Sequence, residues 1–399
     1  MDAFVKREQK PEPKKGETGQ KPTCKYGAGC YRRNREHLEQ FAHDLENQAP
    51  SDKQRLSPAP KKAKPEILSP AKKPRDSDSG SSSSDDEDDD IVPVPPAEQL
   101  LAFAESVFGF PVDEGLWGLA KSLRPSDPLN AFSEAGIKLC GPYDILAGRL
   151  SHRKEVSKSA CLRHCRFHND PPELQTYFYD DQFHYGYLRD GGEFKPVVVS
   201  SPNANEAFAK LHILSDNLLT AMELVLSKRV EANEELLPLL EAVQKAVSDS
   251  GLQLSASISA AEKRRRLWVA PTLHGAGICV PVHKDVGYRP LPTSNGELKK
   301  LLASIESCKD EDQRAAKLAK VDEIITYVQF ANDECDYGEG LELGLDLWAS
   351  ASPGLQSRAV QLLSVAYLLL QRPQHAAVLK AHAAKRSADF TEITEGLFL

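Results

Sequence analysis

A long segment that cannot build a hydrophobic core constrains the fold of this chain more than any other feature. Residues 45–91 are low in aromatic side chains and rich in Pro, Ser, Lys and Asp. A segment of this composition buries too little apolar surface to offset the entropy lost when its backbone is ordered. We therefore expect 45–91 to be a disordered linker between a short N-terminal module and a folded part that begins near residue 92.

Charge is spread unevenly along the 399 residues. Residues 1–75 hold 18 Lys+Arg and 10 Asp+Glu, residues 76–90 hold eight acidic and no basic residues, and residues 91–399 hold 32 basic and 40 acidic residues. An acidic folded part argues against broad nucleic-acid binding there. The basic clusters at 61–64 and 72–75 are typical of nuclear import signals, with ordinary solvated charge as the alternative.

Four candidate zinc ligands lie within residues 21–44 in a C-x5-C-x6-H-x5-H pattern: Cys24, Cys30, His37 and His43. Two thiolates and two imidazoles satisfy tetrahedral zinc, and so short a segment has too small a core to fold without the metal. The spacing leaves no room for the recognition helix of a DNA-reading finger. We therefore predict a zinc finger that binds a molecule other than duplex DNA.

Aromatic and basic residues alternate with these zinc ligands. Tyr26, Tyr31 and Arg32 offer aromatic faces for adenine and a guanidinium fork for phosphate. The segment resembles the poly(ADP-ribose)-binding zinc finger. This resemblance implies zinc as a cofactor and poly(ADP-ribose) as a ligand of residues 21–44.

A second group of Cys and His residues has ligand-like spacing: Cys161, His164, Cys165 and His168. The group lacks the separated second pair that zinc modules usually have. We predict ordinary packing or surface positions for these side chains, and the sequence leaves open whether they bind a metal.

Cysteine usage and hydropathy bear on the compartment. The 8 cysteines of the chain do not form the pattern of a disulfide framework, which fits a reducing environment. No apolar run approaches the roughly 20 residues that span a bilayer, and no apolar stretch follows Met1. We expect an intracellular protein without a membrane partner.

The folded part divides by pattern into a domain at 92–205 and a second at 206–399. Three aromatic or β-branched runs separated by turn residues predict a meander, and later apolar residues follow helical spacing. The predicted strands are 174–179, 183–188 and 196–200, and the predicted helices are 97–108, a long helix with Leu211 to Val225 on one face, 236–247, 297–308, 312–330, 341–348, 355–371 and 375–384. Strands followed by helices indicate an α+β fold with an antiparallel sheet and a mainly helical C-terminal part.

Three carboxylates crowd the sequence FANDECDYG at residues 330–338. Asp333, Glu334 and Asp336 fall within four positions, and no Lys or Arg lies between residues 330 and 347. Such crowding raises carboxylate pKa values or indicates a missing partner. The alternative is a solvated acidic turn before a helix, with the following glycines as breakers.

Together with Val286 to Pro290, which read VGYRP, this run resembles the histone PARylation factor family. Members of that family are accessory proteins that dock on poly(ADP-ribose) polymerases and complete their active sites for serine modification. The resemblance extends from about residue 92 to the C-terminus. It implies Glu334 as the general base, and it implies partner-binding roles for a further set: Tyr288, Arg289, Asp333 and Asp336. Glu339 departs from the residue expected at its position.

The chemistry of such a site requires a positioned base. A serine hydroxyl attacks the anomeric carbon of NAD as nicotinamide leaves, and a neutral hydroxyl is a poor nucleophile until its proton is removed. Glu334 has the longer reach, while Asp333 and Asp336 hold position. Tyr288 and Arg289 are predicted in a loop as an exposed interface anchor. A half-buried loop tyrosine is the alternative, and Arg289 is also placed to pair with the acidic run.

The leading hypothesis is a protein that is not an enzyme alone. It would bind a poly(ADP-ribose) polymerase, histones and poly(ADP-ribose) as a monomer, at damaged chromatin in the nucleus, with NAD used by the polymerase. One rival is a free-standing hydrolase or transferase that uses Asp333, Glu334 and Asp336, although no nucleotide-cradling glycine motif supports it. The other rival is a scaffold that only reads the polymer.

Overall fold

The computed structural model describes residues 90–192, 194–252 and 256–399. The predicted zinc finger at 21–44 and the linker at 45–91, except its last two residues, lie outside this part. The described residues belong to one compact unit. None of the helices in these ranges combines the length and apolar composition needed to cross a membrane.

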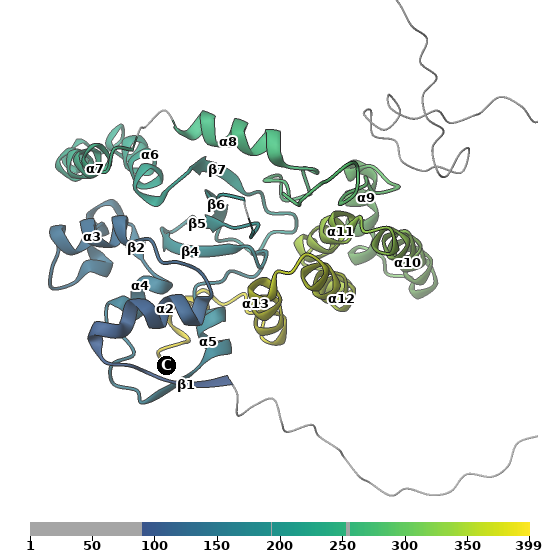
Figure 1. The fold of residues 1–399 in the computed structure, drawn as a ribbon, viewed down its shortest axis with the longest axis horizontal. Helices are drawn as coiled ribbons and strands as arrows, with labels where there is room; N and C mark the ends of the chain where they lie inside the picture. Colours follow the sequence, from purple (N-terminus) through teal and green to yellow (C-terminus); the bar gives the residue numbers. More distant parts are fainter. Residues whose placement is uncertain (1–89, 193, 253–255) are drawn as a thin grey trace, which may run out of the picture. The chain divides into compact units, whose positions relative to one another are not determined.

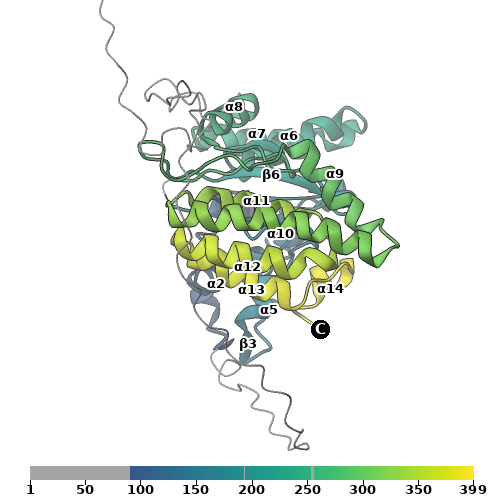
Figure 2. The same cartoon turned by 90° about the vertical axis from the view of Figure 1, so that its right-hand side faces the viewer.

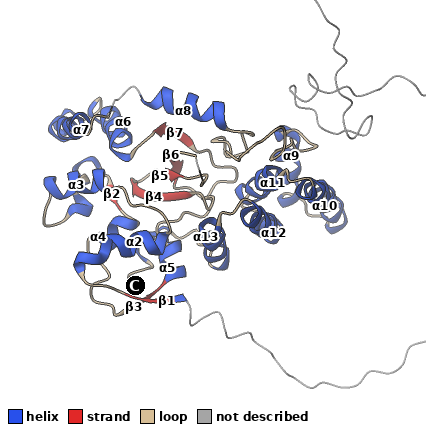
Figure 3. Ribbon diagram, in the orientation of Figure 1, coloured by secondary structure: helices blue, strands red, loops and turns tan. Residues whose placement is uncertain are grey.

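A five-stranded antiparallel sheet forms the centre of the described unit (Figure 3). Its strands, in spatial order, are β2 (Lys138–Leu139), β4 (Leu174–Tyr179), β5 (Phe183–Leu188), β6 (Val197–Pro202) and β7 (His212–Ser215). A separate two-stranded sheet pairs β1 (Ile91–Pro93) with β3 (Glu155–Ser157). The predicted meander is confirmed, with its third strand at Val197–Pro202.

Local chemistry explains the β4–β5 hairpin. The Asp180 carboxylate accepts hydrogen bonds from the backbone N–H groups of Gln182 and Phe183, at 2.8 and 2.7 Å, which closes the turn. The register shifts between Thr176 and Phe178, and a Cβ at Gly186 would lie 2.0 Å from the carbonyl oxygen of the facing strand. Glycine is therefore required beside this bulge.

Helices surround the sheet on several sides. The first group consists of η3 (Ala97–Gln99), α2 (Leu100–Phe108), α3 (Glu114–Leu123), η4 (Pro128–Asn130), η5 (Ser133–Ala135), α4 (Pro142–Leu146), α5 (Lys158–Arg163), α6 (Leu218–Val230), η6 (Glu234–Leu236), α7 (Leu237–Asp249) and α8 (Ala256–Leu267). Apolar residues of α2, α3, α4, α6 and α7 share one core with one face of the sheet. The predicted helices at 97–108 and 236–247 are confirmed, and α8 was not predicted.

The long helix predicted with Leu211 to Val225 on one face is wrong in its first part. Leu214 lies in β7, which pairs with β6, and α6 begins only at Leu218. Asn217 sets this start, because its side chain accepts a hydrogen bond from the N–H of Thr220 at 2.9 Å. Residues 205 and 206, the predicted domain boundary, lie between β6 and β7 of the same sheet.

The C-terminal helices are α9 (Asn295–Glu306), α10 (Glu311–Asp333), α11 (Tyr337–Ala349), α12 (Pro353–Leu369), α13 (Pro373–Ala384) and α14 (Phe390–Glu395). The first five match the predicted helices to within a few residues. Figure 1 shows α9 to α12 on one side of the sheet, and Figure 2 shows α10 to α13 running alongside one another. Their shared core includes the fully buried Trp348 and Tyr367. The described part therefore has a mixed α+β fold.

Candidate functional site

The acidic run forms the turn between α10 and α11. Glu334 is the C-cap residue directly after α10, Cys335 adopts a left-handed φ of 64°, and Asp336 precedes the first residue of α11. Asp333 is exposed, the Glu334 side chain is 23 % exposed, and the Asp336 side chain is fully buried. The three carboxylates that the sequence groups together thus have different environments.

Arg289 joins two of these carboxylates. Its Nε donates to Asp336 Oδ2 at 2.9 Å, and its Nη2 donates to Glu334 Oε2. The backbone N–H of Gly287 donates to the other oxygen of Asp336 at 2.9 Å. The predicted pairing of Arg289 with the acidic run is confirmed.

The predicted exposure of the Tyr288–Arg289 pair is wrong for Arg289 and only partly right for Tyr288. Arg289 is 8 % exposed because its guanidinium group turns inward to the carboxylates. Tyr288 is half-buried, and its hydroxyl donates to Glu342 Oε2 at 2.9 Å. The loop is therefore held by the acidic turn through Arg289 and by α11 through Tyr288.

Gly338 allows this loop to approach the first turn of α11. Its N–H donates to the carbonyl oxygen of Gly287 at 2.9 Å. A Cβ at Gly338 would lie 2.8 Å from Val280 Cγ2 and 3.0 Å from that carbonyl oxygen. The absence of a side chain at Gly338 therefore lets the loop that carries Arg289 lie directly against the acidic turn.

Sequence reasoning missed that buried acids continue along α11. We define the acidic row as Asp336, Glu339, Glu342 and Asp346, all of which are 3 % exposed or less. Their spacing of three and four residues places them on one face of the helix, and this signal is present in the sequence. Asp346 accepts a hydrogen bond from the N–H of Leu273 at 2.7 Å. The row thus binds the segment between residues 273 and 289.

Burial perturbs the titration of this row. Burial raises the pKa of Glu339 to about 8, with Glu342 and Asp336 adding to the increase and Arg289 opposing it. Burial also raises the pKa of Glu342 to about 7, opposed by the Tyr288 hydrogen bond. The pKa of the Asp346 carboxyl is raised well above its usual value, mainly by burial. Glu339 Oε2 lies 3.6 Å from Arg289 Nε and has no hydrogen-bond partner in the described part.

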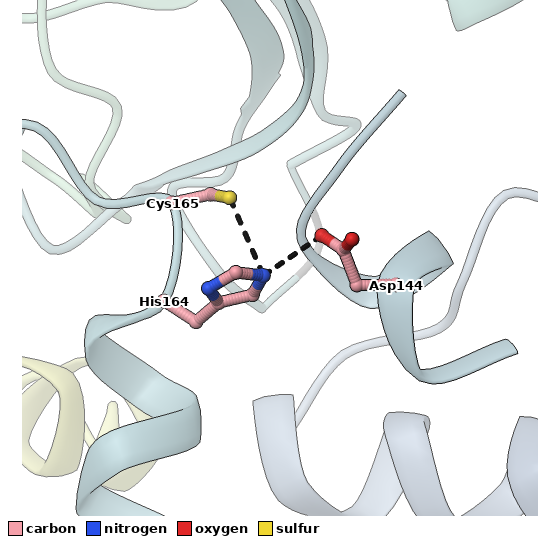
Figure 4. Close-up of side chains that lie close together, drawn as sticks. All are labelled: Asp144, His164 and Cys165. Carbon is pink, nitrogen blue, oxygen red and sulfur yellow. Dashed lines mark hydrogen bonds and ion pairs between the residues drawn. The ribbon is translucent and has the colours of Figure 1, made fainter. Parts of the chain in front are cut away.

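The second Cys and His group forms a different arrangement (Figure 4). His164 Nε2 lies 2.8 Å from Asp144 Oδ2 and 3.4 Å from Cys165 Sγ, and all three side chains are buried. Asp144 was not anticipated, because it comes from α4, 20 residues earlier. Cys161, although also buried, does not take part in these contacts, and His168 is half-buried.

This Asp144–His164–Cys165 group has the distances of a metal site, with candidate ligand atoms within 4.8 Å of one another. Asp144 also accepts a hydrogen bond from Arg149 Nη1 at 2.8 Å. Burial would lower the pKa of His164, but Cys165 and Asp144 outweigh it and raise this pKa to about 10. The geometry therefore describes a buried network of charged and polar groups that already has a cation, Arg149.

Comparisons with known proteins agree with the sequence patterns. Residues 110–386 match the family described as Histone PARylation factor 1, and residues 21–51 match the PBZ domain. The chain is 38 % identical over 301 residues to Histone PARylation factor 1 of Bos taurus, covering 71 % of this chain and 86 % of the relative. It is 37 % identical over 286 residues to the Mus musculus protein of that name, covering 68 % and 82 %.

A relative from Danio rerio, also described as Histone PARylation factor 1, is 38 % identical over 284 residues, with 68 % of this chain and 81 % of the relative covered. The family match includes the loop with Arg289 and the acidic turn with Glu334. The fold and the N-terminal match define an α+β protein with a zinc finger of the poly(ADP-ribose)-binding class. This chain belongs to the Histone PARylation factor 1 family.

Proposed function

We propose that this chain docks on a poly(ADP-ribose) polymerase, supplies Glu334 as a general base and directs ADP-ribosylation to serine side chains of histones and other proteins in the DNA damage response. Membership of the Histone PARylation factor 1 family supports the coarser part of this statement, the histone PARylation factor role. The role of Glu334 as general base is supported by its position: Glu334 lies on a solvent-facing turn, and Arg289 orients its carboxylate.

The proposed chemistry uses Glu334 for a single proton transfer. The serine oxygen forms a bond to the anomeric carbon of the ADP-ribosyl group, and the bond from that carbon to nicotinamide breaks. The hydroxyl proton passes to the Glu334 carboxylate, which makes the oxygen a competent nucleophile. NAD is bound by the polymerase in this scheme, and this chain contributes the base.

The neighbours of Glu334 have positioning and docking roles in the proposal. Arg289 holds Glu334 Oε2, and Asp336 anchors Arg289 from the other side. Asp333, one residue before Glu334, is exposed. In the proposal it contacts the polymerase surface. Tyr288 packs against the core that contains Trp348 and Tyr367, and its side chain is half-buried. We assign direct partner contacts to Asp333 and Tyr288, while the buried Arg289 and Asp336 support docking by holding the turn in place.

The surroundings of Glu334 support a composite site over a free-standing enzyme. Three cavities in the described part of the chain, of about 530, 230 and 10 Å³, are lined by other residues. Enzyme sites usually enclose most of a small substrate in a concave pocket. A carboxylate on an exposed turn requires a second surface to bury the reacting atoms, and a docked polymerase provides it.

The N-terminal PBZ domain has a separate role in the proposal. Cys24, Cys30, His37 and His43 hold zinc, a donor set that suits the tetrahedral geometry of this metal. Tyr26, Tyr31 and Arg32 bind poly(ADP-ribose) through stacking and phosphate contacts. This module keeps a monomeric factor near the polymer that its partner makes, in the nucleus at damaged chromatin.

One assay separates this proposal from its rivals. The purified chain is incubated with NAD and a histone peptide, with and without a poly(ADP-ribose) polymerase, and modified residues are mapped by mass spectrometry. We expect serine modification only when both proteins are present. Modification by this chain alone would indicate a free-standing transferase. Identical modification by the polymerase with and without this chain would leave only a polymer-reading scaffold.

A further inference from the structure

The largest of the three cavities, about 530 Å³, has no residue of the Glu334 turn in its lining and has no role in the proposed function. Its lining comes from the loop after α2, the end of β5 with the following glycines, and the turn between α12 and α13. Its volume falls within the roughly 300–1,000 Å³ of small-molecule sites. The cavity is therefore large enough for a drug-sized ligand.

Arg189 lines this cavity, and among the described residues the hydrogen-bond partners of its guanidinium group are neutral. The residue is 8 % exposed, and its Nη2 donates to the carbonyl oxygen of Pro111 and the hydroxyl of Tyr177, both at 3.3 Å. Its Nη1 is buried and has no hydrogen-bond partner in the described part of the chain. A buried charge is costly unless it is paired, so this arrangement points to an absent anion.

Arg372 is a second buried arginine in the lining of this cavity. It is 5 % exposed, and its Nη2 donates to the carbonyl oxygen of Cys279 at 2.7 Å. Its Nη1 is also buried without a hydrogen-bond partner among the described residues. The carboxyl group of Glu173 interacts with Arg372; burial raises the pKa of Glu173 to about 7 and Arg372 opposes this, so Glu173 only partly neutralises Arg372 near pH 7.

The remaining lining includes three aromatic rings, one acid and one histidine, with small or neutral residues between them. The Arg189 guanidinium carbon lies 5.1 Å from the Phe110 ring centroid and 4.7 Å from that of Tyr187. Asp113 is occupied, since its oxygens accept hydrogen bonds from the Leu116 N–H at 3.0 Å and the Tyr187 hydroxyl at 2.7 Å. Burial lowers the pKa of His375 to about 4, which leaves it neutral at pH 7. Among the described residues that line the cavity, two arginines stand against one aspartate.

We propose that this cavity binds a small phosphorylated aromatic molecule of the nucleotide class. Arg189 and Arg372 contact the phosphate, because a planar guanidinium group matches two oxygens of a phosphate at once. Phe110 and Tyr187 contact the planar base, because aromatic faces stack on bases of any sequence. The site is distinct from the Glu334 turn and from the zinc finger.

Calorimetric titration of the full-length protein with adenosine 5′-monophosphate tests this proposal. We expect saturable binding, weakened at least tenfold when either adenosine or inorganic phosphate replaces the nucleotide. Benzoate tests the alternative anion, a carboxylate on an aromatic ring, and binding of benzoate more tightly than the nucleotide would overturn the assignment to phosphate.

Two variants locate the binding. Arg189→Lys keeps the charge but loses the planar fork, and Gln374→Trp adds a large ring at an exposed position that lines the cavity. Each should raise the dissociation constant of the nucleotide at least tenfold, whereas Arg124→Lys, at an exposed arginine outside the cavity, should not. Gln374→Trp leaves both buried arginines in place, so it should keep the wild-type melting temperature.

Repeating the titration with Cys30→Ala tests whether the zinc finger, and not the cavity, binds the nucleotide. Unchanged nucleotide affinity in Cys30→Ala, with loss in Arg189→Lys and Gln374→Trp, is the predicted result. Wild-type affinity in both cavity variants, or no saturable binding at all, would overturn the proposal. Loss of binding in Cys30→Ala alone would place the ligand on the finger and would equally overturn it.

Discussion

Among individual residues, Arg289 organises the site. Its Nε and Nη2 bind Asp336 and Glu334, which lie on either side of Cys335. Because the guanidinium group is planar and its donors are fixed, it sets the spacing of the two carboxylates. Arg289→Ala would therefore disturb the fold of the turn as well as any docking surface, so Asp333 is the better position for a test of docking.

Asp333→Ala should weaken binding of the polymerase at least ~30-fold, since truncation of an interface anchor commonly costs more than about 2 kcal/mol. The melting temperature should stay at the wild-type value, because Asp333 is exposed. Isothermal titration calorimetry measures the affinity. Glu323→Ala, another exposed acid on α10, is the control and should bind normally. Equal affinity of Asp333→Ala and wild type would remove Asp333 from the interface.

The raised pKa of Glu339 predicts that the stability of the protein depends on pH. Its folded-state pKa of about 8 lies above the ordinary 4.5, so the native state holds this proton more tightly than the unfolded state. The contribution of Glu339 to stability is therefore present below pH 4.5 and is lost as the pH rises towards 8. Glu339→Gln, which resembles the protonated acid and cannot ionise, should become stabilising relative to wild type as the pH rises.

Urea unfolding at pH 5.5 and pH 8.5 measures this difference. The change in unfolding free energy between Glu339→Gln and wild type should grow by at least about 1 kcal/mol, since one pKa unit corresponds to about 1.4 kcal/mol. Glu323→Gln, an exposed position on α10, should show the same difference at both pH values. A constant difference for Glu339→Gln would mean that Glu339 is not held protonated.

Sequence reasoning identified the acidic turn and its pairing with Arg289, because both lie in short runs with distinctive residues. It did not foresee that Arg289 is buried, since that depends on how a distant loop packs on α11. The acidic row was visible as carboxylates at helical spacing, but acids on one helix face are usually solvated. Asp144 could not be grouped with His164 and Cys165, because only the fold brings α4 beside α5.

Among the secondary-structure elements, the first turn of α11 holds the site together. It receives the loop with Gly287 through a backbone hydrogen bond of 2.9 Å to Gly338. The contact places one backbone directly against another, with no side chain between them. The position of the Arg289 loop therefore depends on a glycine as much as on the charged residues.

Gly338→Ala should destabilise the protein by about 1–2 kcal/mol, because overpacking against Val280 Cγ2 and the Gly287 carbonyl outweighs the better helix propensity of alanine. Gly118→Ala in α3 is the matched control. A Cβ at Gly118 meets nothing within 4 Å, so this change should stabilise by up to about 1 kcal/mol. Shifts of the same sign in thermal melts would contradict the close approach at Gly338.

Helices with a clear apolar face and aromatic strands were predicted within a few residues. The strand β7 was mistaken for helix because Leu211 and Leu214 have a spacing of three that continues into α6. Its short length gave too few alternations to reveal a strand. The helix α8 was missed because its sequence carries adjacent Lys and Arg residues in place of an apolar stripe. Contacts with β7 hold this helix.

For the whole molecule, the proposal divides function between the zinc finger and the folded part. Cys30→Ala removes one of the proposed zinc ligands, so the chain should lose one bound zinc and its affinity for poly(ADP-ribose). Serine modification of a free histone peptide should continue, because Glu334 is untouched. Metal analysis and a filter-binding assay measure the two losses, with Cys308→Ala as the control. Polymer binding that survives this change and metal chelation would exclude the finger as the reader.

In the proposed reaction, Glu334 removes the proton of the serine hydroxyl. Glu334→Gln is nearly isosteric, so it should keep the fold and most of the docking affinity. It cannot accept the proton, and loss of a general base typically lowers the rate about 10²- to 10⁴-fold. Glu323→Gln, on the exposed face of α10, should react at the wild-type rate.

The decisive measurement is the rate of serine modification on a histone peptide, mapped by mass spectrometry, with polymerase, NAD and saturating Glu334→Gln. We expect the variant to bind the polymerase and serine modification to fall at least about 100-fold. Serine modification at the wild-type rate would show that Glu334 is not the general base.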